Sequence, residues 1–177
     1  FNIFYRRIKG KKTSNWDYYG GTTVLMRYTL RLLTTQQYER AASLICACDL
    51  IRIENKEQQE EEFKHGELGE EPISIGLWVG GSSTPNKVSD AREKLNKLIK
   101  DPKEEYNFVV MKCPCCATQI GKVDGITSFD SESIRIRGLH KKDGKTGEVY
   151  FQCGNSSCEY SDIPLPLQVV DESIYEN

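Results

Sequence analysis

Five of the seven cysteines in this 177-residue chain fall in two tight clusters. Cys113 and Cys116 are separated by two residues, and Cys153 and Cys158 are separated by four. Structural zinc sites take four tetrahedral ligands, and two close pairs on facing turns supply them with little strain. We therefore predict one zinc ion bound by Cys113, Cys116, Cys153 and Cys158.

Other residues near these pairs offer alternative ligands. Cys115 could ligate in place of Cys116, but a gap of two residues is the usual zinc knuckle, so we interpret Cys115 as a bystander. His140 lies in a turn rich in lysine and glycine, and His65 lies in an acidic stretch. Both are interpreted as surface histidines. A catalytic zinc is disfavoured, because four cysteine ligands leave no open coordination position.

Cys46 and Cys48 lie outside the clusters, two residues apart on a predicted helix. That spacing points them to different faces of the helix, so they cannot chelate one metal together. We interpret both as small hydrophobic residues.

The segments between the cysteine pairs suit the short strands of a zinc ribbon. β-favouring residues occupy 118–123, 133–137 and 148–151. This region has few large apolar side chains, so the metal would supply most of its stability. We predict that residues 112–162 are a zinc-ribbon insertion between an α/β segment, 1–111, and a return strand within 163–177.

The first half of the α/β segment reads as a strand followed by a helix. The apolar run at 24–26 predicts a buried strand, and Thr34 with Gln37 has the spacing of a capping box that opens a helix. The predicted buried face of that helix contains Ala41, Leu44, Ile45, Cys48 and Ile51.

A second strand and helix follow the acidic run at 54–71. Residues 73–79 favour a strand, which Gly80 and Gly81 end, and Asn86 is a plausible N-cap for the next helix. The apolar face of that helix contains Val88, Ala91, Leu95, Leu98 and Ile99. Two strand-then-helix units predict an α/β fold: a partial parallel sheet with flanking helices.

Composition sets the broad class. The chain is 38% hydrophobic and 28% charged, with a net charge of −2, which suits one α/β body with a small appendage. It contains neither an apolar run long enough for a membrane span nor a signal-type leader. We expect a soluble, cytoplasmic protein with no membrane partner.

Two motifs carry a family resemblance. Residues 22–37, TTVLMRYTLRLLTTQQ, resemble the motif Ia region of superfamily-two helicases. Together with Gly-Leu-Trp-Val-Gly-Gly at 76–81 and Thr-Pro-Asn at 84–86, they resemble the DrmA family of helicase-like proteins from bacterial DISARM anti-phage systems. The resemblance covers residues 20–177. It implies an internal segment of the first RecA-like domain of an ATP-dependent DNA helicase or translocase.

The resemblance also implies residues that grip nucleic acid. In these helicases, motif Ia and the Gly-Gly turn hold the sugar-phosphate backbone of one strand, without reading bases. The matching positions are Arg27, Tyr28, Thr29, Arg31, Gln36, Gly80 and Gly81. A basic cluster in the ribbon offers a second surface for the same partner: Arg135, Arg137, Lys141 and Lys142. Other defence-system subunits are further expected partners.

No ATP-hydrolysing site is predicted. The sequence has no Gly-x-x-x-x-Gly-Lys-Ser/Thr loop, and its one Asp-Glu pair after an apolar run, at 171–172, is interpreted as surface. Phosphoryl transfer needs both a phosphate cradle and a magnesium ligand, so this segment is expected to be inactive alone. The alternative function is an independent zinc-ribbon module that mediates protein–protein interactions.

Overall fold

The computed structural model describes residues 2–10, 21–27, 31–57, 68–79, 84–101, 103–123, 135–142 and 147–169. Its helices are α1 (Asn2–Gly10), α2 (Arg31–Glu57) and α3 (Val88–Lys100). Its strands are β1 (Gly121–Lys122), β2 (Ile136–Arg137), β3 (Leu139–Lys141) and β4 (Val149–Phe151). Several predicted positions lie outside these ranges: His65, Tyr28, Thr29, Gly80, Gly81 and the pair at 171–172.

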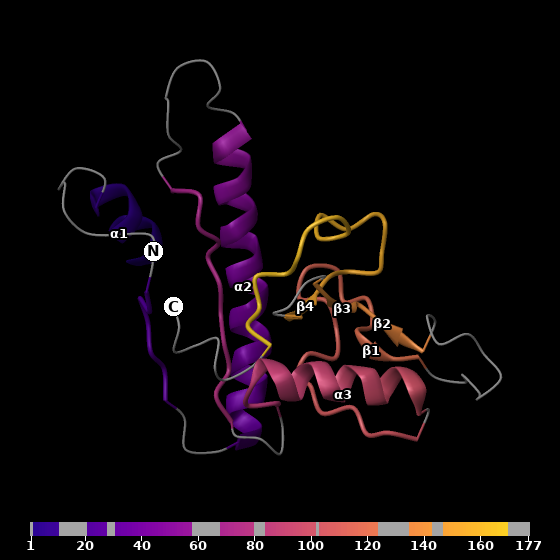
Figure 1. Cartoon of the computed structure of the whole chain (residues 1–177). Coiled ribbons are helices and arrows are strands. Elements are labelled where there is room, and N and C mark those ends of the chain that lie inside the picture. Colours follow the sequence, from indigo (N-terminus) through magenta and orange to yellow (C-terminus); the bar gives the residue numbers. More distant parts are fainter. Residues whose placement is uncertain are drawn as a thin grey trace.

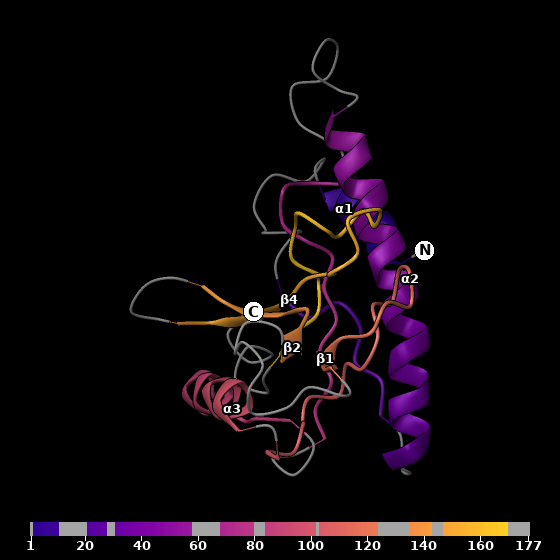
Figure 2. The same ribbon diagram turned by 90° about the vertical axis from the view of Figure 1, so that its right-hand side faces the viewer.

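The long helix α2 and the shorter α3 flank the strands. Figure 1 shows α2 running the height of the molecule and α3 crossing near its lower end. Figure 2 places the strands between the two helices. One cluster of buried apolar side chains includes residues from all of these parts: Tyr38, Ala42 and Cys46 of α2, Ala91, Leu95 and Leu98 of α3, and Ile120, Leu139, Phe151 and Tyr160 of the cysteine-rich region.

The buried face of α2 differs from the predicted one. Tyr38, Ala42 and Cys46 are buried, whereas Leu44 and Ile51 are 65% and 48% exposed. The prediction therefore placed the buried stripe on the wrong residues. The reason is a polar contact: the same face carries Asp49 and Arg52, both buried.

Asp49 and Arg52 turn inward because they hold the chain segment 68–73. The Nε of Arg52 donates to Asp49 Oδ1 over 2.6 Å, and an Nη of Arg52 donates to the carbonyl oxygen of Glu70. The backbone N–H of Ile73 donates to Asp49 Oδ1. Arg7 of α1 donates to the carbonyl oxygens of Leu68, Glu71 and Pro72. Buried charges are stable only when so paired.

The prediction for α3 agrees with the structure apart from its cap. Ala91, Leu95 and Leu98 are buried, and Val88 and Ile99 pack partly buried against the core. The N-cap position is held by Lys87 rather than Asn86, with no side-chain capping hydrogen bond.

The antiparallel strands of the predicted ribbon are present. β1 pairs with β2, with Gly121 opposite Arg137, and β3 pairs with β4, with His140 opposite Tyr150. Each pair forms its own small sheet.

A parallel sheet is not seen among the described residues. They contain one parallel bridge, between Ile75 and Leu167, in which Ile75 N–H donates to Pro166 O and Gln168 N–H donates to Ile75 O. The predicted buried strand at 24–26 is wrong, because residues 22–27 have no strand pairing. Val24, Leu25 and Met26 are 52%, 87% and 56% exposed.

Candidate metal centre and nucleic-acid interface

The first cysteine pair lies on a tight turn in a small hairpin. Cys113 N–H donates to Thr118 O over 2.7 Å, and Ala117 N–H donates to Cys113 O over 2.8 Å. Ala117 has a φ of 61°, a left-handed conformation that an alanine rarely adopts. Lys112 and Gln119 close the hairpin with an antiparallel bridge. These contacts turn the chain so that Cys113 and Cys116 point the same way.

The second cysteine pair lies on a turn that follows β4. Cys153 N–H donates to Tyr160 O, and Cys158 N–H donates to Asn155 O, each over 2.9 Å. The side chain of Asn155 accepts a hydrogen bond from Ser157 N–H, which holds the interior of the turn.

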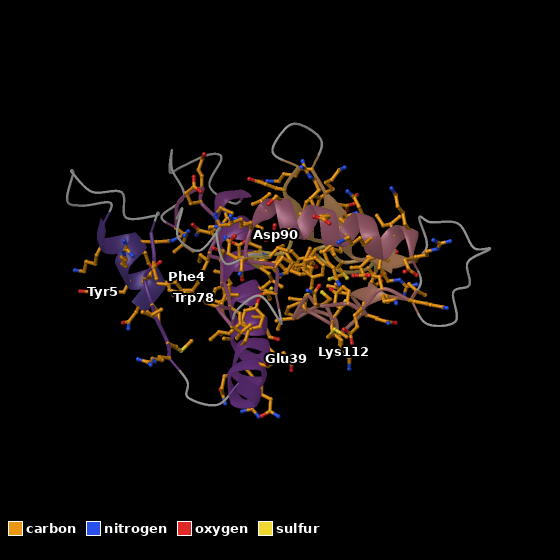
Figure 3. The ribbon with its side chains drawn as sticks, turned by 60° about the horizontal axis from the view of Figure 1, so that its bottom comes forward. Phe4, Tyr5, Glu39, Trp78, Asp90 and Lys112 are labelled. Carbon is orange, nitrogen blue, oxygen red and sulfur yellow. The ribbon has the colours of Figure 1, made fainter. Side chains whose placement is uncertain are left out.

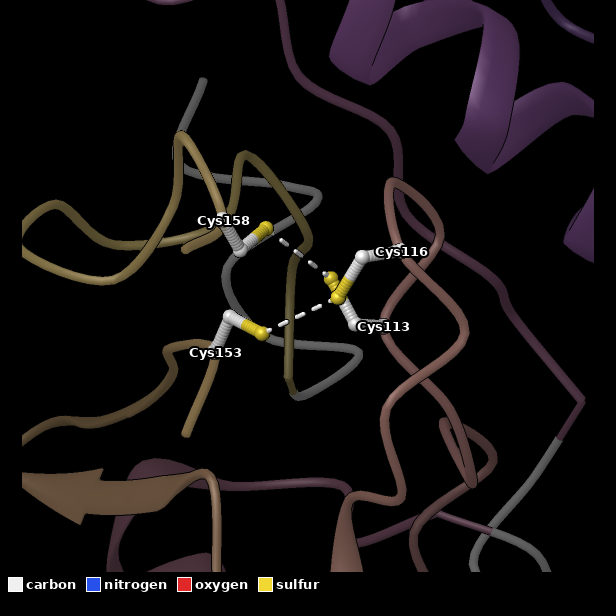
Figure 4. Close-up of side chains that lie close together, drawn as sticks. All are labelled: Cys113, Cys116, Cys153 and Cys158. Atoms are coloured by element: carbon white, nitrogen blue, oxygen red, sulfur yellow. Dashed lines mark hydrogen bonds between the residues drawn. The ribbon is translucent and has the colours of Figure 1, made fainter. Parts of the chain in front are cut away.

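The two turns bring the four predicted ligand sulfurs together, as Figure 4 shows. All four Sγ atoms lie within 4.8 Å of one another. The Cys113 and Cys158 sulfurs are 3.9 Å apart, and the Cys116 and Cys153 sulfurs are 3.4 Å apart. A tetrahedral ion with sulfur bonds of about 2.3 Å separates its ligands by roughly 3.8 Å. The four thiols therefore fit a single metal ion.

Hydrogen-bonding groups surround two of the sulfurs. Asn155 donates its backbone N–H to Cys153 Sγ over 3.4 Å, and its side-chain amide to Cys116 Sγ over 3.8 Å. Thr118 Oγ1 lies 3.1 Å from Cys116 Sγ. Such contacts favour the thiolate form that binds a metal. Sequence reasoning missed Asn155 and Thr118, whose only signal is their position two residues beyond a ligand.

The four thiols differ in how easily they ionise. Burial raises the pKa values of Cys113, Cys153 and Cys158. Burial also opposes ionisation of Cys116, but hydrogen bonds with Thr118 and with Cys153 outweigh it and lower the pKa of Cys116 to about 6. Cys116 is thus the thiol that gives up its proton first.

Cys115 stands apart from this cluster. Its side chain is exposed, and it is not one of the four cysteines whose sulfurs converge. Cys113, Cys153 and Cys158 are buried, whereas Cys116 is exposed. The site therefore has three candidate ligands in the core and one open to solvent.

Among the described residues, the predicted nucleic-acid residues lie in two separate parts of the structure. Arg27 and Gln36 are exposed, and the side chain of Arg31 lies outside the described part of the structure. Figure 1 separates residues 22–27 from the β3–β4 hairpin, with the segment 73–79 between them. The motif-derived and ribbon-derived candidates are therefore two distinct surfaces.

Within the ribbon, the basic residues have different environments. Arg137, Lys141 and Lys142 are exposed. Arg135 is 8% exposed, and its guanidinium donates to the carbonyl oxygens of Ile99 and Lys100 at the end of α3. Arg135 therefore caps a helix in this structure, and its contact with nucleic acid stays a prediction.

Exposed apolar and basic side chains are visible elsewhere on the surface. Figure 3 shows Tyr5 of α1 pointing away from the rest of the molecule. Tyr5 and Trp78 are 54% and 64% exposed. Lys112, on the first cysteine hairpin, is also exposed.

Among the described residues, no helix is both long and apolar enough to cross a membrane.

Comparison with known proteins identifies a relative. The chain is 37% identical over 179 residues to the DISARM protein DrmA of Bacillus paralicheniformis. The match covers 99% of this chain and 14% of the relative, so the chain spans about one seventh of the length of that protein. No protein-family profile matches the chain, and no solved structure matches it.

Proposed function

We propose that this chain, which is similar along 99% of its length to a DISARM protein DrmA, is a zinc-binding, nucleic-acid-gripping segment of a DISARM defence-system protein. The convergence of four cysteine sulfurs within 4.8 Å is the observation that carries the metal-binding part. The similarity of the chain to a DISARM protein, along nearly its whole length, supports the role in defence.

Zinc is the metal that this donor set fits best. Four thiolates are soft ligands, and a tetrahedral set of four sulfurs is typical of zinc or iron–sulfur sites. Pairing of the ligands on two tight turns is the usual arrangement of structural zinc. When bound, the ion would cross-link the two turns. The hydrogen bonds from Asn155 would orient Cys116 and Cys153 and partly offset the negative charge of the four thiolates.

The nucleic-acid role is supported by exposed cationic side chains on two surfaces. Arg27 is exposed within the motif Ia-like sequence, and Arg137, Lys141 and Lys142 are exposed on the ribbon. Contacts of such side chains with phosphates would be independent of base sequence. We propose that the phosphate backbone of DNA is the partner, within a longer helicase-like protein.

The alternative is an independent zinc ribbon that binds a protein partner. The packing favours the first proposal, because the ribbon does not have a separate core. Phe151 and Tyr160 of the cysteine-rich region belong to the same buried cluster as Tyr38 of α2 and Leu95 of α3. This shared core supports the proposal that the ribbon is a part of the larger domain.

ATP hydrolysis belongs, in this proposal, to other parts of the parent protein. The chain carries no phosphate-binding loop, so the parent's helicase or translocase activity would need segments beyond it. We expect purified chain to hydrolyse ATP no faster than buffer. Hydrolysis that scales with the amount of chain and copurifies with it would contradict this expectation.

Single-stranded DNA binding as a function of salt tests the nucleic-acid role. Bound lysines and arginines release counterions from phosphates, so affinity should fall as salt rises. In the longer parent protein, Arg27→Glu with Arg31→Glu should weaken binding whatever the base sequence and flatten its salt dependence. Arg40→Glu is the matched control, because it reverses an exposed charge on α2 outside the motif Ia-like residues 22–37. Unchanged binding by the double charge reversal would remove the motif-derived surface from the proposal.

A further inference from the structure

The β3–β4 hairpin carries an exposed pair of aromatic rings. His140 and Tyr150 lie directly opposite each other in the antiparallel register. Their rings are stacked, with centroids 5.6 Å apart and an interplanar angle of 27°. His140 is exposed and Tyr150 is half-buried. Their neighbours Leu139, Val149 and Phe151 are buried, so the ring pair occupies the solvent face of the hairpin.

Positive side chains lie at both ends of this ring pair. Lys142 is exposed and two residues beyond His140, so it lies on the same face of the hairpin. At the other end, the side chain of Arg137 lies across Gly154, where an added Cβ would come within 2.9 Å of Arg137 Cγ. Gly154 lies two residues beyond Gln152, whose N–H donates to Gly138 O, so Arg137 lies at the end of the hairpin nearest the second cysteine turn.

The positive charge of Lys142 is partly neutralised by an acidic residue, Glu148. Lys142 Nζ donates a hydrogen bond to Glu148 Oε2 over 2.7 Å in an ion pair whose two side chains are about half exposed. A surface pair of this kind is weakly held, so a phosphate can compete for the lysine. Partial burial lowers the pKa of His140, which keeps its ring neutral at physiological pH and suited to stacking.

We propose that this face of the hairpin is a stacking platform for single-stranded nucleic acid. Bases stack on the rings of Tyr150 and His140, while Arg137 and Lys142 contact the phosphates on either side. Aromatic rings between cations are the means by which proteins bind single strands without reading sequence, because every base has a stacking face. The inference rests on the proposed nucleic-acid role and assigns it to a specific surface and to unpaired strands.

The test measures binding of the whole chain, loaded with zinc, to a fluorescein-labelled oligothymidine strand and to a duplex of equal length. Wild type should bind the single strand more tightly than the duplex. Tyr150→Ala should lose about 10-fold in affinity, within the roughly 5- to 160-fold range expected for one stacked base. Tyr150→Phe keeps the ring and should bind as wild type. His140→Ala, a second exposed substitution, should weaken binding in the same direction.

Charge variants supply an effect that a purely structural role would not give. Glu148→Gln removes the residue that competes for Lys142, and it should tighten binding. Lys142→Ala should weaken binding and reduce the slope of affinity against salt by about one. Zinc content and thermal midpoint, measured on each variant, show that the fold is intact.

Contrary outcomes separate this inference from the proposed function. If Tyr150→Ala and His140→Ala bind as wild type while Arg27→Glu is weakened, the platform is wrong and the proposed nucleic-acid role stands. If wild type shows no salt-dependent binding to any strand, the nucleic-acid role fails, and the platform fails with it. If the hairpin variants bind single-stranded DNA as wild type but no longer bind a defence-system protein subunit, the face is a protein-binding surface instead.

Discussion

Tyr160 donates its hydroxyl hydrogen to the carbonyl oxygen of Cys46 over 2.8 Å. Tyr160 follows the ligand Cys158 by two residues, and Cys46 lies in the middle of α2. The tyrosine side chain is fully buried. This contact joins the second cysteine turn to the helix, so the candidate metal centre and the helical part of the chain should unfold together.

Tyr160→Phe should cost about 1 kcal/mol, because it removes one hydrogen bond and keeps the ring. Tyr160→Ala should cost about 3–5 kcal/mol, since it also leaves a cavity in the core. Urea unfolding followed by circular dichroism measures both. Helical and zinc-release transitions should coincide in the wild type. Two separate transitions would show that the ribbon folds independently.

Asp49→Ala should destabilise the chain by about 3–5 kcal/mol, because it leaves Arg52 buried without its partner and Ile73 N–H without its acceptor. The matched control is Glu93→Ala, which breaks an exposed ion pair with Lys97 on α3. That variant should unfold at the wild-type urea concentration. Equal shifts of the urea midpoint for the two variants would contradict the importance of the buried pair.

Arg135 and Arg137 are two residues apart and should behave differently. Arg135→Ala removes the charged donors to the last turn of α3 and should cost about 1.5–3 kcal/mol of stability. Arg137→Ala should leave the thermal midpoint unchanged and weaken single-stranded DNA binding. A stability loss confined to the Arg137 variant would overturn this assignment.

The exposed and buried thiols should differ in alkylation. Burial raises the pKa of Cys46 to about 12, so at pH 9 only about one thiol in a thousand is the reactive thiolate. Iodoacetamide at pH 9 should label exposed Cys115 in the folded, zinc-loaded chain and leave Cys46 unlabelled. In urea the pKa of Cys46 falls to about 8.5, and labelling should follow. Peptide mass spectrometry locates the label; rapid labelling of Cys46 in the folded chain would show that the core is open.

The cysteine spacing and the α3 pattern were readable from sequence because their signals are local. Ligand pairs two and four residues apart constrain one turn each, and the apolar spacing of Ala91, Leu95 and Leu98 defines a single helix face. Both predictions depend on residues close together in the chain.

The errors arose where distant contacts decide the outcome. The buried face of α2 includes Asp49, because its carboxylate accepts a hydrogen bond from Ile73 N–H. Ile73 lies 24 residues further along the chain, so no local pattern predicts this contact. The burial of Arg135 likewise could not be read from the sequence, because it depends on the carbonyl oxygens at the end of α3. The apolar run at 24–26 is strand-like by composition, yet its side chains are exposed in this chain.

Zinc content of the purified chain tests the account most directly. Elemental analysis should give about one zinc per chain. Cys113→Ser and Cys158→Ser should lose the metal, whereas Cys115→Ser should keep it and serves as the matched control. Full zinc occupancy in both ligand variants, or no zinc in the wild type after purification without chelator, would contradict the four-cysteine site.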